Sequence, residues 1–411
     1  MATVMVANPF KPGAGHMPPY LAGRDKELKQ FSTLLGQKTI LTNVILTGLR
    51  GVGKTVLLEK FKPLALEKKW LWVGTDLSES TSINEETVAK RLLTDLSVVT
   101  SRINISENTH PVGFSEKGNT KEKTLTYKAL YELYETSPGL VADKIKSVLY
   151  FVWLCTKELG INGIAFAYDE AQTMSDHADK DQYPLSLLLD VFQSIQKRDI
   201  PFMLVLVGLP TLFPRLVEAR TFAERMFTII MLDRLEETPS REAILKPIED
   251  EKCPVRFNEK SINLIVTTSG GYPYFIQYIC KEIFDIFLQK TAKGDDLSVP
   301  LTEIIRKMDS DFFAGRWARA TDRQRDLLKV VASLPNCDEE FSVQEIVAAS
   351  KKVPPPFSPS HTNQMLASLS DAGLVYKNRH GRYALAVPLL GQFIRRQEKE
   401  RQQFPWQPRL L

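Results

Sequence analysis

Short apolar runs alternate with amphipathic stretches along the first half of the chain. The runs suit buried strands and occupy residues 43–47, 70–74, 164–168, 202–207 and 228–232. Between them, apolar residues recur at helical spacing, which predicts helices over residues 24–35, 54–68, 141–159, 185–197 and 213–225, with a further helix opening near Asn84. Strands that alternate with helices form right-handed βαβ units, so we expect an α/β domain with a doubly wound parallel sheet covered on both faces.

The pattern changes after Asp233. Strand-like runs stop, and helical spacing predicts three helices over residues 240–251, 258–268 and 272–291. Further helices are predicted over residues 322–333, 343–350 and 360–372, followed by two short strands within 374–387 around a turn at Gly381. Three helices and a hairpin in this order are typical of a winged helix-turn-helix.

These patterns divide the 411 residues into four parts, in keeping with a chain too long for one core. We expect an N-terminal arm rich in Pro and Gly over residues 1–23, laid over the first domain. An α/β domain over 24–233, a small helical domain over 234–295, called the lid below, and a winged helix domain over 296–411 follow. The polar stretch 101–123 predicts a loop or partly disordered insertion.

Composition narrows the class of protein. The net charge of +4 is too small to indicate nucleic-acid binding by the chain as a whole. Four cysteines lie far apart without metal-ligand spacing, which suggests reduced thiols. We expect a cytoplasmic protein without a membrane span, because no signal-peptide pattern opens the sequence and no run reaches the ~18 apolar residues that a span needs.

A phosphate-binding motif follows the first predicted strand and opens a helix. Its residues match G-x-x-x-x-G-K-[ST] in full: Gly48-Leu49-Arg50-Gly51-Val52-Gly53-Lys54-Thr55, with Val56 counted among the binding residues. Glycines allow backbone N–H groups to point at phosphate oxygens, and the helix N-terminus adds partial positive charge. Lys54 would neutralise the β- and γ-phosphates and Thr55 would bind Mg²⁺. The motif therefore predicts ATP and Mg²⁺ as cofactors.

Two carboxylates follow the apolar run 164–168. A buried strand presents the residues after it at the carboxyl edge of the sheet, beside the phosphate-binding loop. Asp169 would hold magnesium through water, and Glu170 would act as the general base for ATP hydrolysis. The alternative interpretation is a helix cap for the segment that follows.

Together these motifs resemble AAA+ ATPases of the origin-recognition initiator-like branch. The resemblance covers about residues 8–290 and rests on the stretch 21–28, the loop 48–55, the acids at 169–170 and Gly271-Tyr272-Pro273. It implies that Arg24 lies near the adenine. It also implies that the lid segment Gly271 to Tyr274 closes over the nucleotide, with Tyr272 and Pro273 as binding residues.

Two positions depart from the family pattern. Gly208-Leu209-Pro210 stands where a polar sensor is usual, with Thr211 the nearest polar residue, and Tyr274 stands near where the lid arginine is expected. Hydrolysis is therefore predicted to be slow or activated by a partner. The Gly-x-Pro sequence of the lid is closer to signal-transduction ATPases with many domains (STAND).

An arginine precedes the last predicted strand of the sheet. The resemblance implies that Arg225 is an arginine finger for a neighbouring subunit in a homo-oligomer or a complex with a protein partner. Arg220 competes for this role. The alternative for Arg225 is a surface arginine or salt-bridge partner.

The predicted winged helix offers candidate DNA contacts. Polar residues open its third helix and basic residues occupy its wing and tail: Ser358, Ser360, His361, Thr362, Asn363, Gln364; Lys377, Arg379, His380, Arg382; Arg395, Arg396, Lys399, Arg401. The acidic residues 338–340 reduce the net positive charge of this region. The first hypothesis is an ATP-binding and ATP-hydrolysing switch that couples nucleotide state to DNA binding or oligomer assembly. The alternative is a STAND-like signalling or defence regulator whose winged helix docks on the ATPase or a protein partner.

Overall fold

The computed structural model describes residues 7–13, 15–107, 121–249, 253–293, 300–351, 355–379 and 381–403. Two compact units form, each assembled from separate stretches of sequence. We call Arg24–Thr47 with Leu57–Met231 the sheet unit, and Met1–Gly23, Gly48–Val56 and Leu232–Leu411 together the lid unit. In the described part of the chain, no helix combines the length and apolar character needed to cross a membrane.

The sheet unit is built on five strands in the order β2-β5-β6-β1-β7. They are β1 (Asn43–Gly48), β2 (Trp70–Val73), β5 (Gly163–Tyr168), β6 (Phe202–Gly208) and β7 (Phe227–Leu232). The pairs β1–β6, β5–β6 and β2–β5 are parallel. Every residue of β1, β5 and β6 is buried, as expected for strands covered on both faces. The predicted doubly wound parallel sheet is confirmed.

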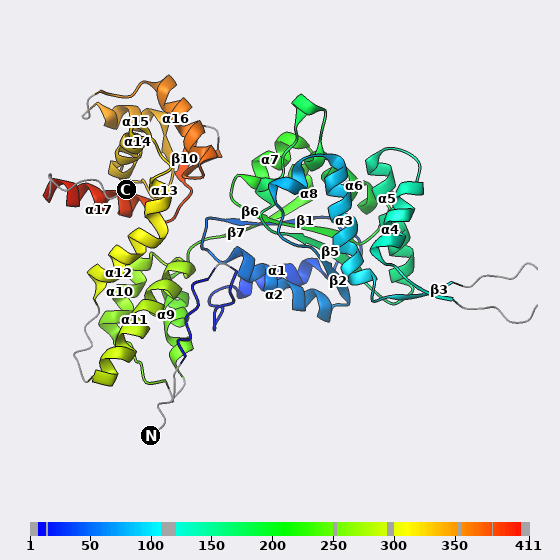
Figure 1. The fold of residues 1–411 in the computed structure, drawn as a ribbon, viewed down its shortest axis with the longest axis horizontal. Coiled ribbons are helices and arrows are strands. Elements are labelled where there is room, and N and C mark those ends of the chain that lie inside the picture. The colour runs from blue at the N-terminus through cyan, green and yellow to red at the C-terminus, as the bar shows by residue number, and fades with distance from the viewer. Residues whose placement is uncertain are drawn as a thin grey trace, which may run out of the picture. The chain divides into compact units, whose positions relative to one another are not determined.

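Eight α-helices accompany these strands in the described chain between residues 25 and 226. They are α1 (Asp25–Leu34), α2 (Lys54–Glu67), α3 (Glu85–Thr100), α4 (Tyr127–Thr136), α5 (Val141–Lys157), α6 (Pro184–Gln196), α7 (Leu212–Ala219) and α8 (Ala223–Met226), with 3₁₀ turns at Glu79–Ser82, Ala171–Thr173 and Ala178–Lys180. Figure 1 shows α1 on one side of the strands and α3 and α6 on the other. Phe31 of α1 stacks on Phe61 of α2 at 4.1 Å between ring centroids.

Three details of the sheet unit differ from the sequence-based expectation. The ends of the expected loop 101–123 form an antiparallel pair, β3 (Asn104–Glu107) and β4 (Lys121–Thr124), while 108–120 lie outside the described residues. The helix expected over 213–225 is two helices, because Arg220 adopts an extended conformation (φ −146°, ψ 117°). Helix α4 was not expected from the sequence. Its N-terminus is capped by the hydroxyl of Thr126, which accepts from Ala129 N.

The lid unit is mainly helical. Its lid helices are α9 (Glu237–Leu245), α10 (Glu259–Ser269) and α11 (Pro273–Lys293), with a 3₁₀ turn at Lys246–Ile248 that replaces the end of the helix expected over 240–251. Next come α12 (Leu301–Met308), a π-helical segment (Asp309–Ala314) and α13 (Gly315–Trp317), none of which the periodicity had indicated.

The C-terminal part of the lid unit is a winged helix, as predicted. It comprises α14 (Asp322–Ser333), β8 (Phe341–Ser342), α15 (Val343–Ser350), α16 (Pro359–Asp371), β9 (Val375–Arg379), β10 (Arg382–Leu385) and α17 (Leu390–Gln403). The three strands form an antiparallel sheet in the order β8-β10-β9. The wing is the β9–β10 hairpin.

One hydrophobic core runs through the whole lid unit. It extends from Phe275 and Phe284 of α11 through Phe313 of the π-helical segment to Phe393 of α17. Phe313 is completely buried and stacks on Phe275 and Phe393, with ring centroids 5.9 and 5.1 Å away. Helices on both sides of residues 294–299 therefore share a single core.

The N-terminal arm packs on the lid. Phe10 belongs to the lid-unit core and lies 6.2 Å from the ring of Phe257, and Asn8 Nδ2 donates to Lys281 O at 2.9 Å. The expectation that the arm covers the α/β domain is wrong at these residues, because the aromatic side chain of Phe10 finds its apolar partners in the lid.

Candidate functional site

The phosphate-binding loop lies in the lid unit, between the end of β1 and the start of α2. Gly51 (φ 80°) and Gly53 (φ 93°) adopt left-handed conformations that side chains with a Cβ disfavour. At Gly48 an added Cβ would lie 2.4 Å from Leu232 O, closer than any real contact. All three glycines of the motif are therefore required by the backbone geometry.

Lys54 places its charge inside the bend of this loop. Its Nζ donates to Gly48 O at 2.9 Å and to Leu49 O at 3.0 Å. Lys54 is also the first residue of α2, where the N–H groups and the helix dipole favour an anion. The ammonium group and the helix N-terminus thus combine at one point, with Thr55 and Val56 in the first helical turn.

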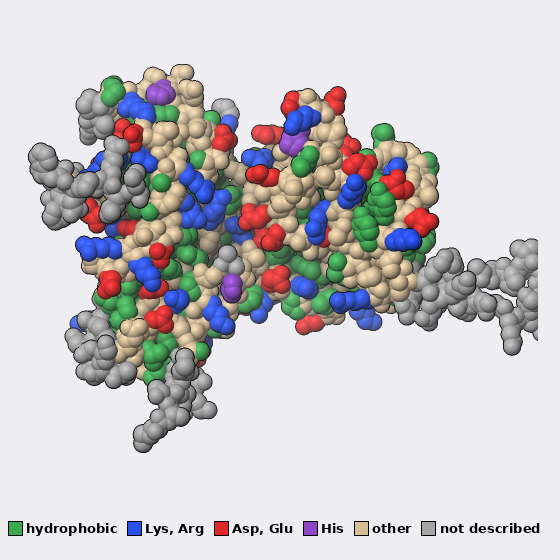
Figure 2. Space-filling view, in the orientation of Figure 1, with side chains coloured by type: hydrophobic (Ala, Val, Ile, Leu, Met, Phe, Trp, Pro, Cys, Tyr) green, Lys and Arg blue, Asp and Glu red, His purple; other side chains and the backbone are tan. Residues whose placement is uncertain are grey.

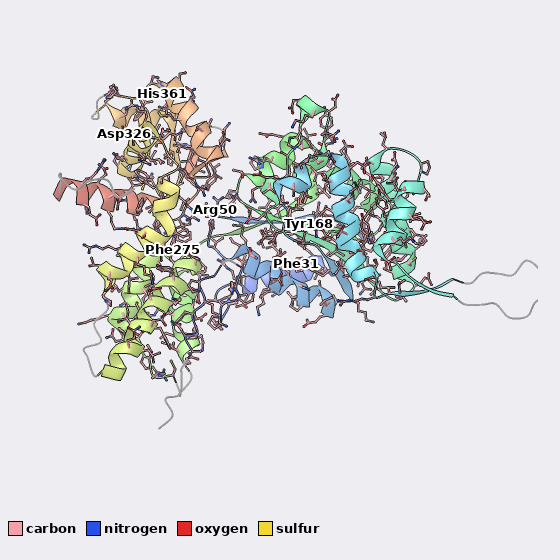
Figure 3. The ribbon with its side chains drawn as sticks, viewed as in Figure 1. Phe31, Arg50, Tyr168, Phe275, Asp326 and His361 are labelled. Carbon is pink, nitrogen blue, oxygen red and sulfur yellow. The ribbon has the colours of Figure 1, made fainter. Side chains whose placement is uncertain are left out.

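The lid and the winged helix both contact this loop directly. Tyr274 N, in the first turn of α11, donates to Gly51 O at 3.1 Å. Arg50 Nη1 donates to Gly373 O at 3.3 Å, just beyond the C-terminal end of α16, where the helix dipole favours a cation. Arg50 is labelled in Figure 3.

Sequence reasoning included Tyr274 in the lid segment expected to close over the nucleotide, and its contact with Gly51 agrees with that expectation. It missed Gly373 as a neighbour of the loop. Tyr272 itself is mostly buried, and burial raises its pKa above the ordinary value. No local signal marks Gly373, because it is separated from Arg50 by more than three hundred residues of chain and only the fold brings them together.

The two predicted acids lie in the sheet unit, directly after β5. Asp169 is only 3% exposed, and its backbone is fixed by Leu77 N donating to Asp169 O (2.9 Å) and Asp169 N donating to Thr75 O (3.2 Å). Its Oδ1 accepts from Glu170 N at 2.7 Å. A carboxylate held in this way has little freedom to reorient.

Glu170 is exposed and conformationally unusual. Its φ of 53° and ψ of 30° are left-handed, which costs a non-glycine residue about 1–2 kcal/mol. Such strain is found preferentially at functional sites. The residue is held there by Thr173, whose N and Oγ1 both donate to Glu170 O at 2.9 Å.

Gln172 links the Glu170 carboxylate to the neighbouring strand. Its Nε2 donates to Glu170 Oε2, while its Oε1 accepts from Leu209 N at 3.1 Å, directly after β6. The amide therefore lies at the strand end where a polar sensor residue was missing from the sequence. Its position two residues after Glu170 was the available signal, and sequence reasoning did not use it.

The carboxyl ends of β1, β5 and β6 lie at one edge of the sheet. Thr47 of β1 pairs with Gly208, and Tyr168 of β5 pairs with Leu206. In open parallel sheets, ligands bind beyond this edge. Asp169 and Glu170 follow one of these strand ends, and the phosphate-binding loop follows another in the sequence.

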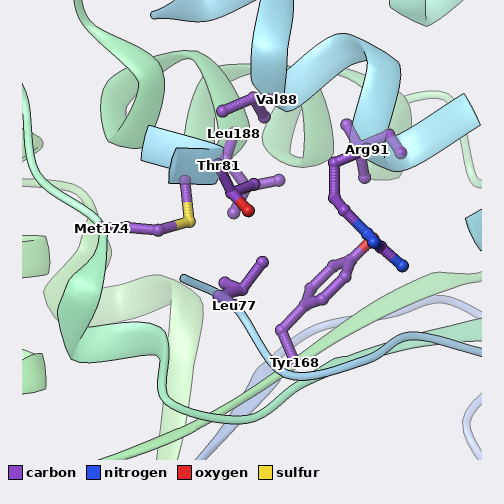
Figure 4. A pocket seen from close by; sticks show the side chains of 8 residues that line it. Leu77, Thr81, Val88, Arg91, Tyr168, Met174 and Leu188 are labelled. Atoms are coloured by element: carbon purple, nitrogen blue, oxygen red, sulfur yellow. The ribbon is translucent and has the colours of Figure 1, made fainter. Parts of the chain in front are cut away.

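A small internal pocket lies beside the end of β5, and it is not a ligand site. Its volume is about 10 Å³, at the limit for a single water molecule. Figure 4 shows the Tyr168 ring directed at Arg91, which forms a salt bridge with Asp95. Complete burial of Tyr168 raises the pKa of its hydroxyl well above the ordinary value, so this cluster is part of the core beneath Asp169.

The arginines singled out from the sequence have different surroundings. Arg24 is 6% exposed, with Nη1 3.9 Å from Glu27 Oε1. Arg220 forms two hydrogen bonds to Asp190 (2.9 and 2.7 Å), so it already has an anionic partner. Arg225 is exposed and makes no salt bridge among the residues that the structure describes. Arg225 is thus the better placed of the two finger candidates.

The polar residues at the start of α16 fall into two groups. Thr362 is completely buried and donates to Ser358 O, and Ser358 Oγ caps the helix by accepting from His361 N, so both serve the fold. The remaining candidates are exposed: Ser360, His361, Asn363 and Gln364. Thr362 is therefore withdrawn as a DNA contact.

Most described basic residues of the wing and tail have acidic partners. The pairs are Arg382–Glu345, Arg395–Asp338, Arg396–Asp309 and Arg401–Glu398. Lys377 and Lys399 are exposed. The side chain of Arg379 and all of His380 lie outside the described part. Figure 2 shows acidic side chains interspersed with basic ones on the face in view, so the cationic surface is weaker than the sequence suggested.

Comparisons with known proteins agree with this architecture. The family described as a domain of unknown function (DUF8462) matches residues 310–394. No curated protein matches the sequence. Among solved structures, a Walker-type ATPase of Pyrococcus abyssi is 16% identical with a TM-score of 0.57, covering 91% of this chain and 96% of that one.

The ORC2 protein of Aeropyrum pernix is similar in two nucleotide states. Its ADP form is 14% identical with a TM-score of 0.53, covering 94% of this chain and 97% of that one. Its ADPNP–ADP complexes give 14% and 0.52, with 95% and 98% coverage. These likenesses confirm the predicted resemblance at the level of fold: the chain has the fold of origin-recognition-type AAA+ ATPases, with a parallel α/β sheet, a helical lid and a winged helix.

Proposed function

We propose that this chain is an ATP-binding AAA+ switch with slow or partner-activated ATPase activity. The observation that carries the proposal is the loop 48–55. It bends around the Lys54 ammonium group at a helix N-terminus, and it is hydrogen-bonded to the lid at Gly51 and to the winged helix at Arg50. A phosphate bound in the loop would therefore be linked through the loop to the elements that an AAA+ switch must move.

The residues fit a nucleotide with magnesium. Lys54 and the loop amides would bind the phosphates, Thr55 would bind Mg²⁺, and Asp169 would hold the ion through water. Mg²⁺ is usually bound by one or two carboxylates together with phosphates and water.

For hydrolysis, Glu170 accepts a proton from the attacking water as general base. Gln172 bonds one of the two carboxylate oxygens and leaves the other for water. Arg225, exposed at the end of α8, is available to a neighbouring subunit as an arginine finger. Efficient turnover therefore depends on an oligomer or a protein partner.

Helix α16 connects the phosphate-binding loop to the candidate DNA contacts. Its C-terminal end meets Arg50 through Gly373, and its first turn carries the exposed His361, well separated from Arg50 in Figure 3. Thirteen residues of α-helix span about 20 Å as a rigid rod. A displacement of Arg50 on nucleotide binding is transmitted by this helix to the polar residues that we propose as DNA contacts.

A second candidate function is a regulator without DNA readout. It is favoured by the same Arg50–Gly373 bond, which docks the winged helix on the phosphate loop, and by the acidic partners of the wing and tail arginines. In this function the winged helix restrains the ATPase, and a protein partner releases it.

Nucleotide chemistry is tested by calorimetry and phosphate release with Mg²⁺. We expect Lys54→Ala to lose ATP binding, and Glu170→Gln to bind ATP without turnover. Lys60→Ala, an exposed lysine of α2, is the matched control and retains both. If the unmodified protein takes up no ATP with Mg²⁺, the proposed function is wrong.

Measurements of DNA binding at several salt concentrations distinguish the DNA-binding switch from the regulator without DNA readout. Phosphate neutralisation gives a steep negative slope of log affinity against log salt. We expect ATP-dependent duplex binding that weakens when His361, Asn363 and Gln364 are all replaced by alanine. Absence of duplex and single-strand binding at low salt with ATP would favour the regulator.

A further inference from the structure

Two arginines of the lid unit, Arg50 and Arg316, lie close enough for their positive charges to interact. Arg316 of α13 lies in the lid unit, with its guanidinium 4.1 Å from the centroid of the Phe312 ring and donating to Phe312 O. Neither Arg316 nor Arg50 forms a salt bridge within the described ranges of the chain. Asp311, the closest acid in sequence, is hydrogen-bonded to Tyr278 OH at 2.8 Å.

A continuous set of contacts joins Arg316 to the loop. The Phe312 ring lies 5.2 Å from the Tyr274 ring, and Tyr274 N donates to Gly51 O at 3.1 Å. Burial raises the pKa of Tyr274, so its hydroxyl stays neutral and supplies no negative charge. Arg316 is thus held near the loop by aromatic packing rather than by an anion of the protein.

The electrostatic surroundings of Arg316 are unfavourable for a cation. Burial lowers its pKa, the positive charges of Arg50 and Arg319 lower it further, and Tyr274 opposes only part of this effect. Half-burying like charges without a counter-ion is costly, and a bound anion removes that cost. The π-helical segment that precedes Arg316 is a rare local structure that is frequent at functional sites.

We infer that Arg316, together with Arg50, binds the terminal phosphate of a nucleoside triphosphate held in the loop 48–55. This inference rests on the proposed function and adds a residue from outside the recognised motifs. The planar guanidinium suits two phosphate oxygens at once, which an ammonium group cannot match. Because Arg316 lies between the lid and the winged helix in the sequence, its engagement makes the lid unit respond to ATP but not to ADP.

The test compares ATP and ADP binding by calorimetry with Mg²⁺ on the full chain. We expect Arg316→Ala to weaken ATP binding about tenfold or more and ADP binding less than about threefold. Arg316→Lys keeps the charge and loses part of the effect. Arg316→Gln keeps a donor for Phe312 O, and it gives the same comparison if the alanine variant is unstable. Arg306→Ala, an exposed arginine of α12, is the matched control and changes neither affinity.

The outcomes separate the inference from the proposed function. Unchanged ATP affinity in Arg316→Ala and Arg316→Gln overturns the inference and leaves nucleotide binding intact. Equal weakening of ATP and ADP overturns the assignment to the terminal phosphate. If the unmodified protein binds neither nucleotide, both the proposed function and the inference fall.

Discussion

Replacing Gln172 with alanine tests how the general base is positioned. The change removes the amide that donates to Glu170 Oε2 and accepts from Leu209 N, and it leaves Asp169 and the phosphate loop unaltered. Glu170 is exposed and its left-handed backbone leaves the side chain dependent on this bond for orientation. We therefore expect an effect on turnover rather than on nucleotide affinity.

The magnitude follows from the lost hydrogen bond. A hydrogen bond to a charged group contributes about 1.5–3 kcal/mol. The exposure of Glu170 argues for the lower end, and about 1.4 kcal/mol corresponds to tenfold in rate. Gln172→Ala should thus lower kcat about tenfold with KM changed less than about twofold. Because Gln172 is itself partly exposed, the free energy of unfolding should change by less than about 1 kcal/mol.

The assay is steady-state phosphate release as a function of ATP concentration. Gln193→Ala is the matched control, since Gln193 is a partly exposed glutamine whose side chain is bonded only to Lys197 among the described residues. If Gln172→Ala keeps the kcat of the parent while Glu170→Gln is inactive, the amide does not position the base. A change confined to KM would refute the reasoning equally.

Three further outcomes follow from the structure. Phe313→Ala should lower the free energy of unfolding in urea by about 3–5 kcal/mol, because Phe313 is fully buried in the core shared by lid and winged helix. Separate unfolding of the two parts would contradict a shared core. Gly51→Val should abolish ATP binding in calorimetry, since Gly51 has a φ of 80° and an added Cβ would lie 2.9 Å from Tyr274 Cβ. Retained affinity for ATP would show that the loop tolerates a side chain at this position. Burial raises the pKa of Tyr376 from its ordinary value of 10 to about 12. The unfolded chain then loses this proton first, so stability falls as pH rises through this window, and Tyr376→Phe should reduce that fall in urea titrations at pH 10 and 12.

The sequence by itself determined the sheet and the location of its chemistry. Strands such as β5 and β6 are buried along their whole length, so each had to be a continuous apolar run, visible without a structure. The Gly48–Thr55 motif was equally recognisable in the sequence, because the left-handed backbone at Gly51 and Gly53 favours glycine at those positions. Asp169 and Glu170 were located by the strand that precedes them.

Only the tertiary structure decided which residues surround these motifs. Gly373 meets Arg50, Phe312 meets Tyr274, and each contact joins segments too far apart for any local pattern to signal. Thr362 is also excluded as a DNA contact because its side chain is buried, although its residue type suited that role. Hydrophobic periodicity reports which face of an element is buried, whereas the partner on that face depends on how the whole chain packs.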